Sequence, residues 1–151
     1  MITEQQQGRS KRLELYELLE NIEKTKSRKD KIDLVSQYVS TYNSFADYLR
    51  CVFDSRVNFH FPASRPPYDP APEENHPSTW HKQHMKLAYF VKGLKGDEMI
   101  PIKRESMFIG VLESVHPRDA EILVDMLSKK TKCKGLTEKL VKEAVPQLLP
   151  A

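Results

Sequence analysis

Basic residues gather around a single glycine in the stretch KKTKCKGLTEKL, residues 129–140, in a pattern that could bind phosphate. Gly135 precedes Thr137, a residue type that commonly caps helices. A helix start exposes unpaired N–H groups and the positive end of its dipole, and a preceding glycine lets an anion approach the backbone closely. The stretch therefore predicts either a phosphate-binding cap or a solvated corner whose lysines serve the preceding helix.

A second basic cluster falls where two predicted helices join, and its members are Lys24, Lys26, Arg28, Lys29 and Lys31. Alone, such a cluster is typical of a solvated linker. Two basic clusters, each at a helix start, would hold two phosphates at a fixed separation if the fold placed them on one face. The sequence leaves open whether they share a face.

Three histidines form a candidate metal site. His81 and His84 have the spacing that puts both on one face of a helix, and His76 lies close in sequence. Cysteine and carboxylate partners at recognisable spacing are missing, so surface histidines beside a proline-rich loop are the alternative. The motifs G-x-S-x-G, H-E-x-x-H and G-x-x-x-x-G-K-[ST] do not occur, and Glu105 and Glu113 are predicted to lie on helix surfaces. We therefore expect no catalytic residue, metal or cofactor.

Apolar residues recur with helical periodicity along most of the chain and predict the elements that position these groups. We expect helices at residues 10–24, 27–39, 43–54, 79–91, 103–114, 117–130 and 137–144. Ser27 and Thr137 are predicted caps, and Asp119 is expected to favour the dipole of the helix that starts at Pro117. No useful strand-period alternation occurs. The sequence therefore predicts an all-α fold of about seven helices.

Residues 55–78 interrupt this pattern with six prolines, which remove backbone donors and disfavour helix. Phe59 and Phe61 are expected to attach this long loop to the core, and the loop is either functional or mobile. Residues 1–9 have no periodic apolar face and are expected to form a disordered tail. Residues 10–151 are predicted to form a single helical domain.

The composition allows nucleic-acid binding without demanding it. The 151 residues carry a net charge of +3, which is only mildly basic. No apolar run approaches the roughly 20 residues that span a bilayer, and no secretory signal follows the N-terminus, so we expect a cytoplasmic protein. Two cysteines are too few for a disulfide framework. Cys51 is predicted to be buried and Cys133 to be partly exposed.

Two segments resemble the N-terminal DNA-binding domain of ATP-dependent DNA ligases, especially those of T-even-type phages. The first is EKTKSRKDKIDLVSQYVSTYNSFADYLRCVFDSRVNFHFP, residues 23–62, and the second is HPRDAEILVDMLSKKTKCKGLTEKLVKEAVPQLLP, residues 116–150. The second segment shares an acidic helix start at Asp119, a leucine-rich helix, a basic turn with Gly135 and a final proline, Pro146. The adenylation motif K-x-D-G is absent from the 151 residues. The resemblance therefore implies a stand-alone phage protein that grips DNA without the ligase enzyme.

The resemblance also implies an all-α domain that contacts phosphates across the minor groove of duplex DNA. Family contacts, carried over to this chain, fall on Lys130, Lys132, Lys134, Gly135, Thr137 and Lys139, with Lys26, Arg28 and Lys29 in support. Phosphate contacts position a protein without specifying bases, so sequence preference is expected to be weak. Neutralising roughly six phosphates would give a slope of roughly −5 in log K against log salt.

Three functions follow as hypotheses. The first is a non-catalytic duplex DNA-binding phage protein, accessory to replication, repair or transcription in the host cytoplasm. The second is a protein-interaction module that binds and modulates a phage or host protein, with Tyr68 and Trp80 as contacts. The third is a metal-dependent enzyme built on the three histidines. None of the three involves a membrane.

Overall fold

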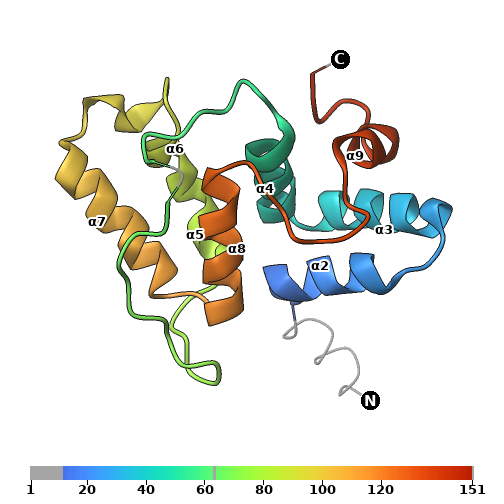
Figure 1. Ribbon diagram of the computed structural model, residues 1–151, viewed down its shortest axis with the longest axis horizontal. Coiled ribbons are helices and arrows are strands. Elements are labelled where there is room, and N and C mark those ends of the chain that lie inside the picture. Colours follow the sequence, from blue (N-terminus) through green and yellow to red (C-terminus); the bar gives the residue numbers. More distant parts are fainter. Residues whose placement is uncertain (1–11, 63, 151) are drawn as a thin grey trace.

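The computed structural model describes residues 12–62 and 64–150, and helices are the regular elements of their fold (Figure 1). The longer helices are α2 (Leu15–Lys24), α3 (Arg28–Thr41), α4 (Asn43–Phe53), α7 (Pro101–Leu112), α8 (Pro117–Leu127) and α9 (Glu138–Ala144). The one β-type pairing in the described residues is an isolated bridge between Phe59 and Val91. The all-α prediction is confirmed. The predicted tail, residues 1–9, lies outside the described residues.

Helices α3 and α9 begin at the capping residues that the sequence predicts. The Ser27 hydroxyl oxygen accepts the Asp30 N–H at 3.0 Å and starts α3. The Thr137 hydroxyl oxygen accepts the Leu140 N–H at 3.2 Å and starts α9. Pro117 occupies the first turn of α8, where a missing N–H costs nothing. Both predicted caps are therefore confirmed.

The helix predicted at residues 79–91 is broken into three short pieces. They are α5 (Trp80–Gln83), the 3₁₀ turn η1 (His84–Lys86) and α6 (Leu87–Phe90). A second 3₁₀ turn, η2 (Lys95–Glu98), follows before α7. A 3₁₀ turn winds more tightly than an α-helix and shifts the angular register of the residues after it. Trp80, Leu87 and Phe90 all remain buried across this shift.

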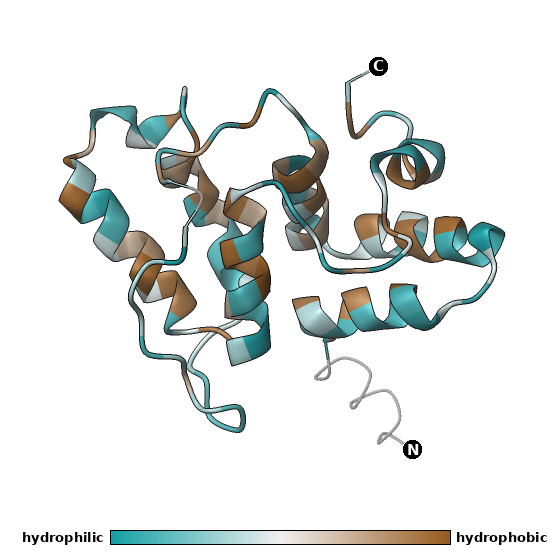
Figure 2. Cartoon of the chain, viewed as in Figure 1, coloured by the Kyte–Doolittle hydropathy of each residue, from teal (hydrophilic) through white to brown (hydrophobic). Residues whose placement is uncertain are grey.

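One hydrophobic core joins the helices, and α4 lies at its centre. Helix α4 packs against α3, α5, η1 and α8. Its side chains Phe45, Tyr48, Leu49 and Val52 are buried, on the face that helical periodicity gives to residues 43–54. Figure 2 shows the consequence as apolar stripes that alternate with polar ones along the helices. None of the described helices combines the length and apolarity needed to cross a membrane.

The proline-rich segment, residues 55–78, has no helix but is bonded to the helices at several points. Phe61 packs against Phe90 and Phe108, with ring centroids 5.6 and 4.9 Å away. The Asp69 N–H donates to a Glu113 carboxylate oxygen at 2.8 Å, so Glu113 has a structural partner rather than a free surface position. The predicted attachment of this segment to the core through its phenylalanines is confirmed.

Helices α2 and α8 contact each other near their starts and diverge from there (Figure 1). The Tyr16 N–H near the start of α2 donates to Asp119 Oδ1 near the start of α8 at 2.8 Å. Beyond the far end of α8, the Cys133 thiol donates to the Leu19 carbonyl at 3.3 Å. The same two helices therefore position a site at each end.

Candidate nucleic-acid interface

The two predicted basic clusters meet in the folded chain. Gly135 has φ +88°, and a Cβ built on it would stand 2.9 Å from Lys31 Cε. The turn that precedes α9 therefore rests on the corner between α2 and α3, and α9 packs on α3. We call this surface the basic corner, which comprises residues 24–31 and 129–139.

Lys31 is an internal member of the basic corner. Its ammonium group donates to the carbonyl oxygens of Ile22 at 2.8 Å and Glu23 at 3.3 Å, and also to that of Thr25. These carbonyls end α2, where a cation compensates the negative end of the dipole. The side of Gly135 where a Cβ would stand faces the Lys31 side chain. The glycine thus permits a close turn over Lys31.

Three other predicted contacts have internal partners as well. The Thr137 oxygen is used in capping the seven-residue helix α9. Arg28 forms an ion pair with Glu143 at 2.5 Å, which joins α3 to α9. Lys132 Nζ lies 3.6 Å from Asp125 Oδ2. Exposed pairs of this kind contribute about 0–1 kcal/mol, so a phosphate could still compete for Arg28 and Lys132.

Besides Lys132, five predicted site lysines are exposed: Lys26, Lys29, Lys130, Lys134 and Lys139. None of them forms an ion pair within residues 12–62 and 64–150. They come from both clusters, since two belong to the α2–α3 corner and three to the turn and α9. These five are the predicted site residues whose charge is available to a ligand.

The side chain of Lys129, the first residue of the turn in the basic corner, contacts α4 instead of the other basic residues. The residue has a left-handed backbone, with φ 61°, and its ammonium group donates to the Asp54 carbonyl at the end of α4 at 2.7 Å. The sequence predicts that Lys129 serves the C-terminal end of its own helix. It instead serves the C-terminal end of α4, and burial lowers its pKa.

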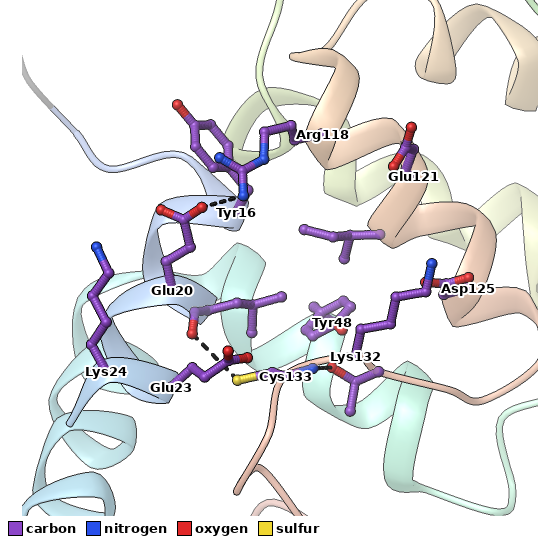
Figure 3. A pocket seen from close by; sticks show the side chains of 13 residues that line it. Tyr16, Glu20, Glu23, Lys24, Tyr48, Arg118, Glu121, Asp125, Lys132 and Cys133 are labelled. Atoms are coloured by element: carbon purple, nitrogen blue, oxygen red, sulfur yellow. Dashed lines mark hydrogen bonds and ion pairs between the residues drawn. The ribbon is translucent and has the colours of Figure 1, made fainter. Parts of the chain in front are cut away.

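A pocket of about 420 Å³ opens between α2 and α8 beside the basic corner (Figure 3). Leu19, Tyr48 and Cys133 form a buried floor. The charged lining residues are Glu20, Glu23, Lys24, Arg118, Glu121, Asp125 and Lys132. Glu20 pairs with Arg118, and Glu23 Oε1 accepts the Lys134 N–H at 3.0 Å. Carboxylates therefore stand next to the lysines of the basic corner.

Sequence reasoning missed these carboxylates, although a signal was present. Glu20 and Glu23 are three residues apart on α2, and Glu121 and Asp125 are four apart on α8, so each pair lies on one helix face. The prediction for Cys133 is also wrong, because this residue is buried rather than partly exposed. Burial raises the pKa of its thiol to about 11. Cys51 is buried as predicted.

At the opposite ends of α2 and α8 lies a carboxyl–histidine cluster, which comprises Glu14, His76, His116 and Asp119. His76 Nε2 is 2.8 Å from Glu14 Oε2, and the His76 and His116 ring centroids are 5.3 Å apart. Asp119 is fully buried, and its Oδ2, like Glu14 Oε1, has no hydrogen-bond partner within the described residues. Burial raises the pKa of the Asp119 carboxyl to about 7. This cluster ties the proline-rich segment to the starts of both helices.

The three candidate histidines form hydrogen bonds with different partners. His76 belongs to the carboxyl–histidine cluster. His81 lies between Ser44 Oγ and the Leu13 carbonyl, each at 2.6 Å, and burial lowers its pKa. His84 Nδ1 is 2.6 Å from Asp47 Oδ2. Within residues 12–62 and 64–150, no three histidine, cysteine or carboxylate side chains are placed to hold a metal ion.

The predicted contact Trp80 is also engaged inside the molecule. Its side chain is 2% exposed, and its Nε1–H donates to the Ser44 carbonyl at 2.9 Å. Tyr68 is half-buried, with the Arg65 guanidinium 4.6 Å from its ring centroid. The expectation that Trp80 contacts a partner protein is therefore wrong.

Comparison with known proteins gives a family without an assigned activity. The sequence model of the Family of unknown function (DUF6433) matches residues 18–133, which is more than half of the chain. Searches of curated proteins and of solved structures found no match. The matched residues include α2 from Leu18 onward, the whole of α3, α4 and α8, and the start of the basic turn as far as Cys133. The chain belongs to the Family of unknown function (DUF6433).

Proposed function

We propose that this chain binds the phosphate backbone of duplex DNA through the basic corner and does no chemistry on it. The observation that carries the proposal is the contact of Gly135 with Lys31, which brings the two basic clusters to one place. Five exposed lysines, which form no ion pair within residues 12–62 and 64–150, belong to the two segments that this contact joins. Their charges would replace the counterions of the DNA phosphates, and the released counterions would drive binding.

The residues of the basic corner have two roles in this proposal. Lys26, Lys29, Lys130, Lys134 and Lys139 contact phosphates, while Lys31 bonds the end of α2 and Arg28 joins α3 to α9. Lysine is a flexible point charge and carries no base-reading geometry, so sequence preference is weak. The neighbouring carboxylate of Glu23 opposes phosphate binding and keeps the affinity moderate.

The proposal keeps the resemblance to the DNA-binding domain of DNA ligases as its working hypothesis. An all-α domain that grips duplex DNA without an adenylation motif would serve as an accessory to replication, repair or transcription. The helical fold and the basic turn before α9 are compatible with that hypothesis.

Fluorescence anisotropy of a labelled duplex of about 20 base pairs tests the proposal, because binding through phosphates falls steeply between about 50 and 200 mM salt. We expect binding at low salt that weakens at least tenfold over this range. Two duplexes of unrelated sequence should bind alike. An affinity that does not change with salt, or no binding below about 10 μM at low salt, would contradict the proposal.

A further inference from the structure

A second surface exposes large apolar side chains far from the basic corner. The most exposed large hydrophobic residues of the described chain are Met85 (75%), Leu94 (52%), Ile100 (66%) and Ile102 (73%). Leu94, Ile100 and Ile102 belong to one short stretch, residues 92–103, which contains η2 and the first turn of α7. We call this stretch the η2–α7 corner. Grouped exposed aliphatic residues are a mark of interaction sites.

The backbone of the η2–α7 corner is held in place from within. At Gly96 the chain runs against the Tyr89 backbone so closely that a Cβ would stand 1.9 Å from the Tyr89 carbonyl oxygen. The buried Arg104 side chain donates through Nη1 to the Gly96 carbonyl at 2.7 Å and to the Met99 carbonyl at 3.0 Å. These bonds fix the chain between Leu94 and Ile100.

The preceding residues of the corner are fixed as well. Asp97 accepts the Gly93 N–H through both carboxylate oxygens, at 2.9 and 3.0 Å. The same carboxylate lies 2.9 Å from His60 Nε2, which attaches the corner to the proline-rich segment. A surface held in one conformation loses little conformational entropy on binding, so it is prepared for a partner.

The charges around these apolar residues indicate the chemistry of the partner. Lys92, Lys95 and Lys103 are exposed on the corner. Of the two acidic residues there, Asp97 is engaged by Gly93 and His60, which leaves Glu98 as the exposed carboxylate without a partner in the described residues. A complementary surface therefore combines apolar side chains with carboxylates.

The η2–α7 corner and the basic corner lie at opposite ends of the molecule. In Figure 1 the start of α7 is at the left end of the longest axis, while the join of α2 and α3 is at the right end. Figure 2 shows apolar residues at that start of α7, away from the core. A ligand on one corner would therefore leave the other corner accessible.

We infer that the η2–α7 corner docks an acidic protein segment that carries apolar side chains. Leu94, Ile100 and Ile102 are the apolar contacts, and Lys92, Lys95 and Lys103 pair with the carboxylates of the partner. The inference goes beyond DNA binding and does not depend on it. It gives the molecule a protein partner at one end and leaves the other end for phosphates.

Methyl NMR titration of the full chain tests this inference with two synthetic amphipathic peptides that share a leucine face. One peptide carries glutamate on its polar face and the other carries lysine. We expect the glutamate peptide to shift the methyl signals of Leu94, Ile100 and Ile102, and the lysine peptide to leave them in place. The double variant Ile100→Ser and Ile102→Ser should lower the affinity for the glutamate peptide at least tenfold.

The matched control is Met85→Ser, which removes an equally exposed side chain from η1 and should leave the affinity for the glutamate peptide unchanged. Circular dichroism checks that each variant is folded. Equal binding of both peptides, an equal effect of Met85→Ser, or no methyl shift would overturn the inference. Self-association or vesicle binding that the Ile100 and Ile102 variant abolishes would also overturn it, since the occupant would then be a second copy or a lipid surface.

Discussion

Charged residues lie at both ends of helices α2 and α8, and they are largely buried and bonded at one end but exposed at the other. At their starts, Glu14, His76 and Asp119 are buried or half-buried and bonded to one another or to backbone. Beyond their far ends, Lys26 and Lys134 are exposed and lack ion pairs in the described residues. The free energy of a buried ionisable group depends on its protonation, whereas an exposed cation acts mainly on ligands. We therefore expect the first site to affect stability and the second to affect ligand binding.

The same helix dipoles underlie both arrangements. Carboxylates gather at the positive starts, and Lys31 occupies the negative end of α2. Several charged residues of this molecule thus serve helix ends. Only the cations left over after that requirement, such as Lys130 and Lys139, are available to a phosphate.

The largest expected effect comes from the buried site, through Asp119→Asn. The folded pKa of Asp119 is about 7 and its ordinary value is 3.8, so the folded state binds the extra proton between these values. The wild type therefore loses up to about 4 kcal/mol of unfolding free energy as pH rises from about 4 to about 7. The Asp119→Asn variant has no carboxyl at this position and should not show this loss. The asparagine side chain keeps an oxygen for the Tyr16 N–H. Urea unfolding of both proteins at several pH values measures the difference.

The other ionisable groups of that site are present in both proteins. Their contributions to the pH dependence therefore largely cancel when the two unfolding free energies are compared. Burial alone would lower the pKa of His76, but the hydrogen bonds to Glu14 and Glu73 outweigh it and raise it. Burial lowers the pKa of His116. Parallel pH profiles for the wild type and the Asp119→Asn variant would contradict a buried, proton-binding Asp119.

The next largest effect concerns the exposed site. The triple variant Lys130→Glu, Lys134→Glu and Lys139→Glu should lose about 100-fold in affinity for duplex DNA at about 0.1 M salt, because three phosphate contacts are removed. Its melting temperature should change little. The control reverses Lys82, Lys86 and Lys92, which are exposed outside the basic corner and give the same net charge. Equal losses in the two triple variants would show that net charge, rather than the corner, determines binding.

A smaller effect tests how the exposed site is assembled. Gly135→Ala should reduce the free energy of unfolding by about 1–2 kcal/mol, because alanine is strained at this φ and its Cβ would press on Lys31. Gly110→Ala is the control, since Gly110 lies within α7 and an added Cβ meets no atom within 4 Å. That variant should be stabilised by about 0.5–1 kcal/mol. Urea denaturation measures the free energy of unfolding of both variants. An unchanged value for Gly135→Ala would contradict the close contact with Lys31 and leave the glycine only a role toward a ligand.

The smallest effect sharpens the boundary between the basic corner and the acidic pocket. Glu23→Gln keeps an oxygen for the Lys134 N–H but removes a negative charge beside the lysines that we propose to bind phosphate. Duplex affinity should rise about threefold at low salt and the gain should shrink at high salt. Glu105→Gln, an exposed change on α7, should have less effect. Lower affinity in Glu23→Gln would mean that the carboxylate supports binding.

Local features of the fold were predictable from the sequence. The caps Ser27 and Thr137 use hydrogen bonds to residues three positions away, and the buried face of α4 follows from helical periodicity. The two basic clusters were also visible in the sequence. Each of these features depends on spacing within a few residues, which is the information that periodicity carries.

Features that depend on distant contacts were not predictable. Asp119 was expected to serve its own helix, but it also accepts the Tyr16 N–H from α2, 103 positions away. Cys133 is buried because its turn packs beneath α2. Lys31 belongs to a basic cluster in sequence and to the end of α2 in space. Tertiary partners decide which charges stay free, and no local pattern encodes those partners.

The salt dependence of duplex affinity, compared between the two halves of the basic corner, tests the central claim most directly. One double variant reverses Lys26 and Lys29, and the other reverses Lys134 and Lys139. The account predicts a wild-type slope of roughly −5 in log K against log salt, reduced in magnitude by about 2 in each double variant. A change in slope for only one half, or a wild-type affinity independent of salt, would contradict a single phosphate-binding surface built from both clusters.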